Sequence, residues 1–68
     1  MAFQKNDRVK VKQEFQKNYP NWQDVIHGIF IVEHYRNNVG DEKQLSCWAD
    51  NPNDKGLYTL LEPHLILA

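Results

Sequence analysis

Asn6-Asp7-Arg8-Val9-Lys10-Val11-Lys12 is the stretch that decides the fold class of this chain. Val9 and Val11 alternate with charged residues, and this two-residue period indicates a β-strand with one face on a core and the other in water. At the other end, Leu60–Leu67 contains a turn marked by Pro63, followed by a short apolar strand. Together the two stretches predict a small closed β-barrel whose first and last strands meet.

Three further strands are expected between these ends, because short apolar runs alternate there with polar or turn-forming residues. They are Gly28–Tyr35, Gln44–Ala49 and Leu57–Leu61. The first of them is rich in β-branched and aromatic residues and is the strongest strand signal in the chain. Two polar segments, Arg36–Lys43 and Asp50–Gly56, predict the turns that separate the strands.

The segment Gln13–Ile26 is too polar and irregular for a strand. We expect a long ordered loop in which Phe15, Tyr19 and Trp22 pin the chain to the rest of the domain. A short helix over Asn21–Ile26 is the alternative, with its first residue as the helix cap.

This order of strands and loops resembles the SH3-like barrel, in the broad sense that includes Tudor-type and KOW-type modules. The resemblance is carried by Asn6–Val11, by the Gly28-Ile29 strand start and by Leu61–Leu65. Such families often begin with Gly-Asp-x-Val; asparagine replaces that glycine here and also tolerates a left-handed backbone. The resemblance implies a single all-β domain over residues 1–68. It would be a five-stranded barrel with a long first loop and a 3₁₀ turn before the last strand, used for binding.

Length and composition limit the class of protein. A chain of 68 residues forms one domain with a thin core, and its single cysteine cannot form an internal disulfide. A lone thiol fits the reducing cytoplasm, and Met1–Lys5 lacks the apolar core of a signal peptide. We therefore expect a cytoplasmic protein, monomeric or homodimeric, with no membrane partner.

No motif predicts catalysis, a cofactor or a metal site. His27, His34, His64 and Cys47 lie too far apart along the chain to match the paired spacing of zinc ligands. Cys47 lies in an apolar alternation and is expected to be a buried, inert thiol. We expect a non-enzymatic protein. The alternative that includes catalysis is an oligomeric enzyme with a site formed between chains.

The aromatic residues provide the main candidate for a binding face. In the third strand, Trp48 has the parity opposite to the apolar residues and should face outward. We expect it to join Tyr19, Trp22 and Asp24 of the long loop, together with Tyr35, in one patch that binds a protein partner. The alternative is that these rings fold back and form a second small core.

Charge supports a second function class. The net charge is −1, but residues 1–20 carry +3 and residues 21–68 carry −4. A basic strip, Arg8, Lys10, Lys12 and Lys17, could contact the phosphates of RNA or DNA. The acidic remainder argues against tight nucleic-acid binding, so the sequence favours a small adaptor or inhibitor of a protein. The size and the lack of motifs fit a regulator encoded by a phage or plasmid.

Overall fold

The computed structural model describes residues 3–68, so the first two residues of the expected domain and of Met1–Lys5 lie outside the described part. Five strands and three 3₁₀ turns follow one another in these residues. Their order is β1 (Arg8–Val11), η1 (Gln13–Asn18), η2 (Pro20–Trp22), β2 (Phe30–Val39), β3 (Glu42–Ala49), β4 (Leu57–Leu61), η3 (Glu62–His64) and β5 (Leu65–Leu67). The fold is thus mostly β, and no helix in residues 3–68 is long and apolar enough to cross a membrane.

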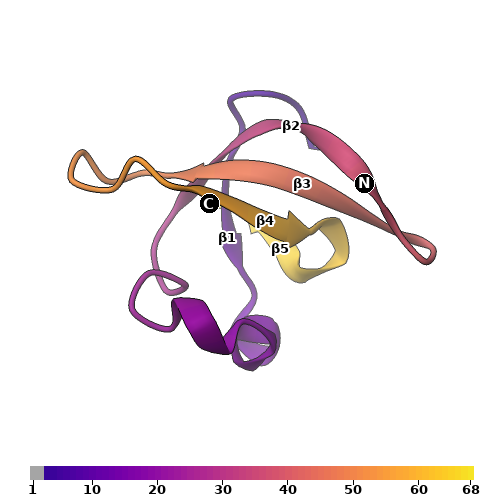
Figure 1. The fold of residues 1–68 in the computed structure, drawn as a ribbon, viewed down its shortest axis with the longest axis horizontal. Helices are drawn as coiled ribbons and strands as arrows, with labels where there is room; N and C mark the ends of the chain where they lie inside the picture. The colour runs from indigo at the N-terminus through magenta and orange to yellow at the C-terminus, as the bar shows by residue number, and fades with distance from the viewer. Residues whose placement is uncertain (1–2) are drawn as a thin grey trace.

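The strands form one antiparallel sheet in the order β4-β3-β2-β1-β5 (Figure 1). The first and last strands meet as predicted, since Val9 lies opposite Leu67 and Val11 lies opposite Leu65. The prediction of a closed barrel is wrong, because β4 and β5 are the two edges of the sheet and do not pair within residues 3–68. Only the three residues of η3 separate β4 from β5. In the described part of the chain, the three-residue strand β5 pairs with β1 alone.

The hairpin of β2 and β3 is longer than the sequence predicts. Arg36–Lys43 was expected to be a turn, but the strands continue to Val39 and from Glu42, so the turn is only Gly40-Asp41. Gly40 has a φ of +63°, which glycine adopts without strain and which a tight hairpin turn requires. The polar residues of this region mark an exposed hairpin rather than the end of the strands, because ladder hydrogen bonds depend on the backbone and not on side-chain polarity. The hairpin tip and the loop after β3 lie at opposite ends of the molecule (Figure 1).

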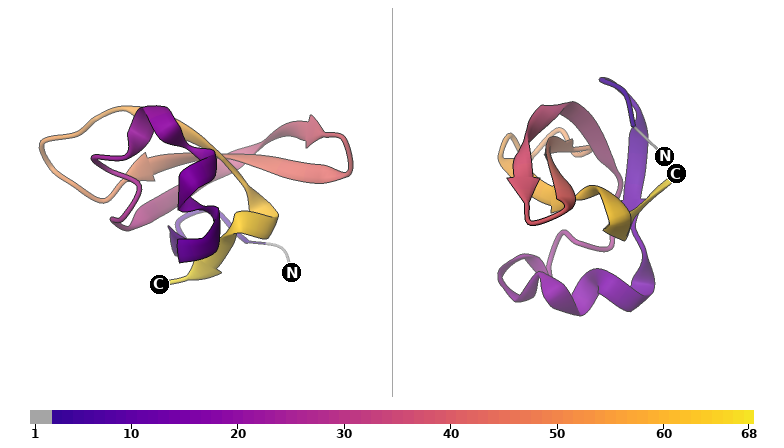
Figure 2. Two further views of the ribbon diagram at one scale, coloured as in Figure 1. Left: turned by 90° about the horizontal axis from the view of Figure 1, so that it is seen from below. Right: turned by 90° about the vertical axis from the view of Figure 1, so that its right-hand side faces the viewer.

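The core lies on the inner face of the sheet, under the long loop between β1 and β2. Its buried apolar residues are Val9, Val11, Ile26, Phe30, Val32, Leu45, Cys47, Leu60 and Leu65. Phe15, Tyr19 and Trp22 of the loop are partly buried against this core, which confirms the ordered, pinned loop. Figure 2 shows the loop lying across one face of the sheet. The loop contains two 3₁₀ turns that were not predicted, and the alternative helix over Asn21–Ile26 is not present. The predicted 3₁₀ turn before the last strand is confirmed as η3.

Candidate functional site

The aromatic rings of the long loop are turned toward the core. Tyr19 stacks on Trp22 with ring centroids 5.7 Å apart, and Trp22 meets Tyr58 of β4 edge-on at 5.1 Å. Tyr58 in turn meets the buried Phe30 at 5.6 Å, so the rings form a continuous series that ends in the core. Tyr19 and Trp22 therefore belong to a second small core, the arrangement that the sequence offered as the alternative to a binding patch.

The hydroxyl of Tyr19 is also used inside the molecule. Its oxygen accepts the Leu61 N–H at 3.1 Å and lies 2.8 Å from Nδ1 of His64, whose ring stacks on Phe15 at 4.3 Å. The tautomer of His64 decides which of the two groups donates in this bond. Burial raises the pKa of Tyr19, and the bond from Leu61 opposes that shift. The Tyr19 hydroxyl is thus hydrogen-bonded to two groups of the same chain.

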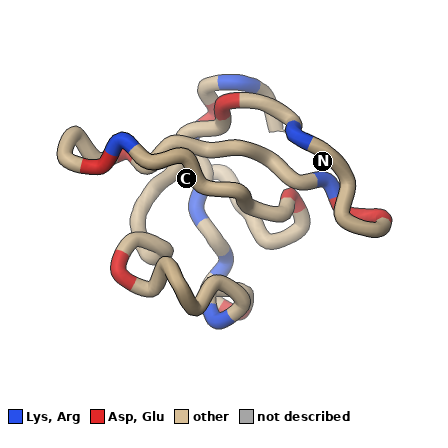
Figure 3. The backbone as a smooth tube through the Cα atoms, in the orientation of Figure 1, with Lys and Arg blue, Asp and Glu red and all other residues tan. Residues whose placement is uncertain are grey.

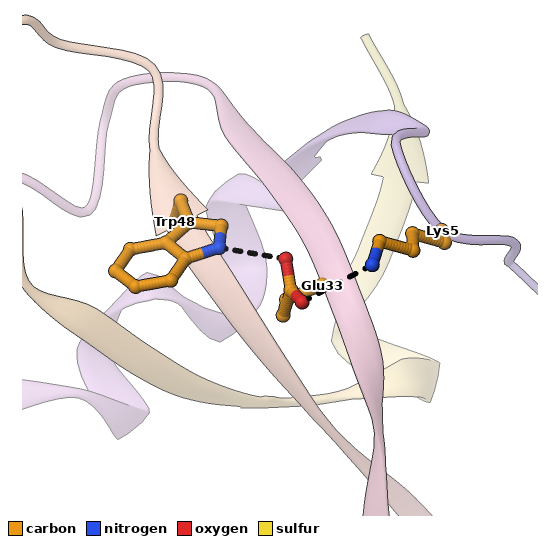
Figure 4. Close-up of polar contacts among 3 residues, drawn as sticks. All are labelled: Lys5, Glu33 and Trp48. Atoms are coloured by element: carbon orange, nitrogen blue, oxygen red, sulfur yellow. Dashed lines mark hydrogen bonds and ion pairs between the residues drawn. The ribbon is translucent and has the colours of Figure 1, made fainter.

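Trp48 is placed differently, on the outer face of β3 and away from the core. The residue is 39% exposed, and its Nε1–H donates to Oε2 of Glu33 at 2.8 Å (Figure 4). The other carboxylate oxygen of Glu33 lies 3.4 Å from Nζ of Lys5. The bond from Trp48, with help from Lys5, lowers the pKa of Glu33, so this acceptor stays ionised near neutral pH. The indole is therefore exposed but held in one orientation.

Two apolar residues flank Trp48 on the same face. Ile31 of β2 and Leu57 of β4 lie directly opposite Trp48 in the two ladders, and Leu57 is 45% exposed. We call Ile31, Trp48 and Leu57 the Trp48 patch. Arg8, which lies opposite Ile31 in β1, is paired with Asp50 at 2.7 Å. The patch thus has an apolar centre, and Arg8 and Asp50 at its margin neutralise each other.

The remaining predicted partner-binding residues do not join this patch. Tyr35 is 53% exposed on the distal part of the β2–β3 hairpin, where its hydroxyl donates to Asn38 at 2.7 Å. Asp24 is exposed at the end of the long loop and lines a shallow hollow together with Asp50. The prediction of one face joining the long loop to Trp48 is wrong, because the loop covers the inner face of the sheet and Trp48 lies on the outer face.

The four residues of the predicted basic strip also lie in different surroundings. Arg8 is neutralised by Asp50, whereas the Lys12 ammonium lies 6.0 Å from the centre of the Phe15 ring, beside the long loop. Lys10 stays on β1 and Lys17 lies on η1. Figure 3 shows Lys and Arg interspersed with Asp and Glu along the described chain rather than gathered in one place.

The groups that could carry chemistry are dispersed or buried. Within residues 3–68 no three His, Cys, Asp or Glu side chains come together in a way that could hold a metal ion. Cys47 is fully buried, and burial raises the pKa of its thiol to about 12. Its thiolate, the nucleophilic form, is therefore scarce at neutral pH.

Sequence reasoning missed Lys5, Glu33 and Leu57 as neighbours of Trp48. Leu57 could have been assigned to the outer face from the alternation within its strand. Its position opposite Trp48 depends on the register across the loop of residues 50–56, which no local pattern specifies. No protein-family model matches this chain, and neither a curated protein nor a solved structure matches it.

Proposed function

We propose that this chain is a small non-enzymatic module that binds a protein partner through the Trp48 patch. The observation that carries the proposal is an exposed tryptophan whose only polar group already has a partner, Glu33. A partner could cover this ring without leaving the indole N–H unpaired, which would otherwise reduce affinity. Tryptophan is also among the residues that most often dominate binding energy at protein interfaces.

We further infer that the open sheet is an SH3-like arrangement. The strand order β5-β1-β2-β3-β4, the long loop after β1 and the 3₁₀ turn before β5 support this inference. Modules of this kind serve mainly in binding, which is consistent with the proposed role but does not specify the partner.

The charges near the patch favour a protein over a nucleic acid. Lys5 is paired with Glu33 and Arg8 with Asp50, so the surface around Trp48 has little uncompensated positive charge. A nucleic-acid interface normally needs a clear basic excess to neutralise phosphates. RNA or DNA binding through Arg8, Lys10, Lys12 and Lys17 is the competing proposal, with less support from the arrangement of these side chains.

The test is capture of partners from a lysate of the cells that make this protein, followed by mass spectrometry. Trp48→Ala and Leu57→Ala should each lose the captured protein, while their circular dichroism stays that of the wild type and their free energies of unfolding fall by no more than about 1 kcal/mol. Ile66→Ala is the matched control, because Ile66 is also 45% exposed but lies on β5.

Two results would contradict the proposal. One is capture that survives both Trp48→Ala and Leu57→Ala. The other is captured material that disappears after nuclease treatment and binds less as salt increases, which would favour the nucleic-acid alternative.

A further inference from the structure

Glu33 lies at an irregularity in the β2–β3 ladder. Val32 lies opposite Cys47, and the next residue of β3 lies opposite His34. Glu33 is therefore an extra residue on β2 that pairs with no β3 residue of the described ladder, which is the arrangement of a β-bulge. Bulges change the direction of a side chain and are frequent beside functional sites. The bulged residue here is the one whose carboxylate accepts the Trp48 indole N–H.

The second oxygen of the Glu33 carboxylate is held from the N-terminal side. Gln4–Asp7 forms a turn, in which Asn6 has a φ of +74°. The turn is joined to β2, because the Asn6 N–H donates to the Val32 carbonyl at 2.8 Å. Lys5 of the turn is thereby placed beside the residue that follows Val32, and its ammonium lies 3.4 Å from Oε1 of Glu33.

Lys5 and Trp48 thus reach the carboxylate from opposite sides, one at each oxygen (Figure 4). An exposed ion pair such as Lys5–Glu33 contributes little energy by itself. Its effect here is to occupy Oε1, which leaves Oε2 for the indole. The bond from the indole has an ionised acceptor, which makes it stronger than a bond between neutral groups.

We infer that Glu33 is the positioning residue of the Trp48 patch, because it holds the indole in the orientation in which a partner binds. This inference rests on the proposed function, since it concerns the same site. A partner that covers Trp48 must immobilise the ring, and a ring that is already oriented loses less conformational entropy on binding. The same acceptor keeps the indole N–H paired when the partner removes the ring from water.

The hydrogen-bond acceptor of Glu33 carries this role, rather than its charge. Glu33→Gln keeps an oxygen that can accept the indole N–H and loses the charge, whereas Glu33→Ala loses both. Glu33→Ala should reduce partner capture by about tenfold, because the ring loses its orientation and its N–H loses its partner. Glu33→Gln should reduce capture by no more than about threefold, since a neutral acceptor binds the indole somewhat less strongly.

The first measurement is made on the free protein, by NMR of the indole N–H groups. In Glu33→Ala the indole N–H of Trp48 should exchange with water about fivefold faster or more, and its heteronuclear NOE should fall. Glu33→Gln should restore most of both values. The indole of Trp22, whose ring packs against Tyr58, is the internal reference and should change in neither variant.

The second measurement is the amount of protein captured from the same cell lysate when each variant is present in limiting amount. Glu42→Ala is the matched control, because Glu42 is also a partly buried carboxylate but lies at the other end of β3 from Trp48. It should capture as much as the wild type. The circular dichroism of every variant should stay that of the wild type.

Three outcomes would overturn the inference and leave the proposed function intact. They are an unchanged Trp48 indole N–H in Glu33→Ala, a freed indole with undiminished capture, and equal losses of capture in Glu33→Gln and Glu33→Ala. The last result would make Glu33 a direct ionic contact for a cationic group of the partner. If no protein is captured in a way that depends on Trp48, the proposed function fails and this inference fails with it.

Discussion

At the scale of single residues, the Tyr19 hydroxyl connects three parts of the chain. The hydroxyl bonds to the backbone of Leu61 at the end of β4 and to the ring of His64 in η3. The ring of Tyr19 stacks on that of Trp22 in η2. His64 is only 7% exposed, so its Nδ1 has little access to water as a substitute partner. Leaving buried polar groups unpaired costs more than a typical hydrogen bond contributes.

Tyr19→Phe should therefore lower the free energy of unfolding by about 1–2 kcal/mol, since the ring contact stays and two polar groups lose their partner. The measurement is urea unfolding followed by circular dichroism. Tyr35→Phe is the matched control, because that hydroxyl is exposed and bonds only within the hairpin, and it should change stability by less than about 0.5 kcal/mol. An equal loss of unfolding free energy in the two variants would show that the hydrogen bonds of Tyr19 stabilise the fold no more than the exposed bond of Tyr35.

At the scale of elements, the long loop between β1 and β2 covers the inner face of the sheet, which a closed barrel would otherwise enclose. It covers the inner face with rings from Phe15, Tyr19 and Trp22, of which Trp22 contacts β4 through Tyr58. The loop has little regular hydrogen bonding of its own beyond two short 3₁₀ turns. Side-chain packing must therefore hold it in place.

Trp22→Ala should reduce the free energy of unfolding by about 2–4 kcal/mol, because it leaves a cavity between the loop and β4. Trp48→Ala, on the outer face, should cost about 1 kcal/mol, mainly the bond to Glu33. Urea unfolding of both variants gives the comparison. If Trp22→Ala were as mild as Trp48→Ala, the loop would not be held by its aromatic residues.

At the scale of the whole molecule, the free energy of unfolding should decrease at alkaline pH. Burial raises the pKa of Cys47 from its ordinary 9.0 to about 12, and it also raises the pKa of Tyr19. The unfolded chain loses these protons first, so it binds fewer protons than the native state in this range. The free energy of unfolding should thus be unaffected by these groups below about pH 9 and fall as the pH rises toward 12.

The measurement is the urea midpoint at several pH values between neutrality and about pH 11. Cys47→Ala is the control: it is less stable at neutral pH because it removes core volume, but its stability should fall less steeply above pH 9. An identical pH slope in both proteins would mean that the thiol does not contribute to the alkaline loss.

Several features could be predicted from sequence because local patterns determine them. Alternating side chains placed Val9 and Cys47 in the core and Trp48 outside it. Asn6 was expected to tolerate a left-handed backbone, and its φ is +74°. The 3₁₀ turn at Pro63 and the boundaries of β4 were also correct, since proline and a dense run of turn residues mark them directly.

The sequence by itself determined which segments become strands, which face of each is apolar and where the turn before β5 lies, because these depend on neighbours a few residues apart. Tertiary structure alone decided that the sheet stays open, that the rings of Tyr19 and Trp22 turn inward, and that Leu57 lies beside Trp48. Those features depend on strand register and on contacts between distant segments, in which burial of the thin core outweighs local preference.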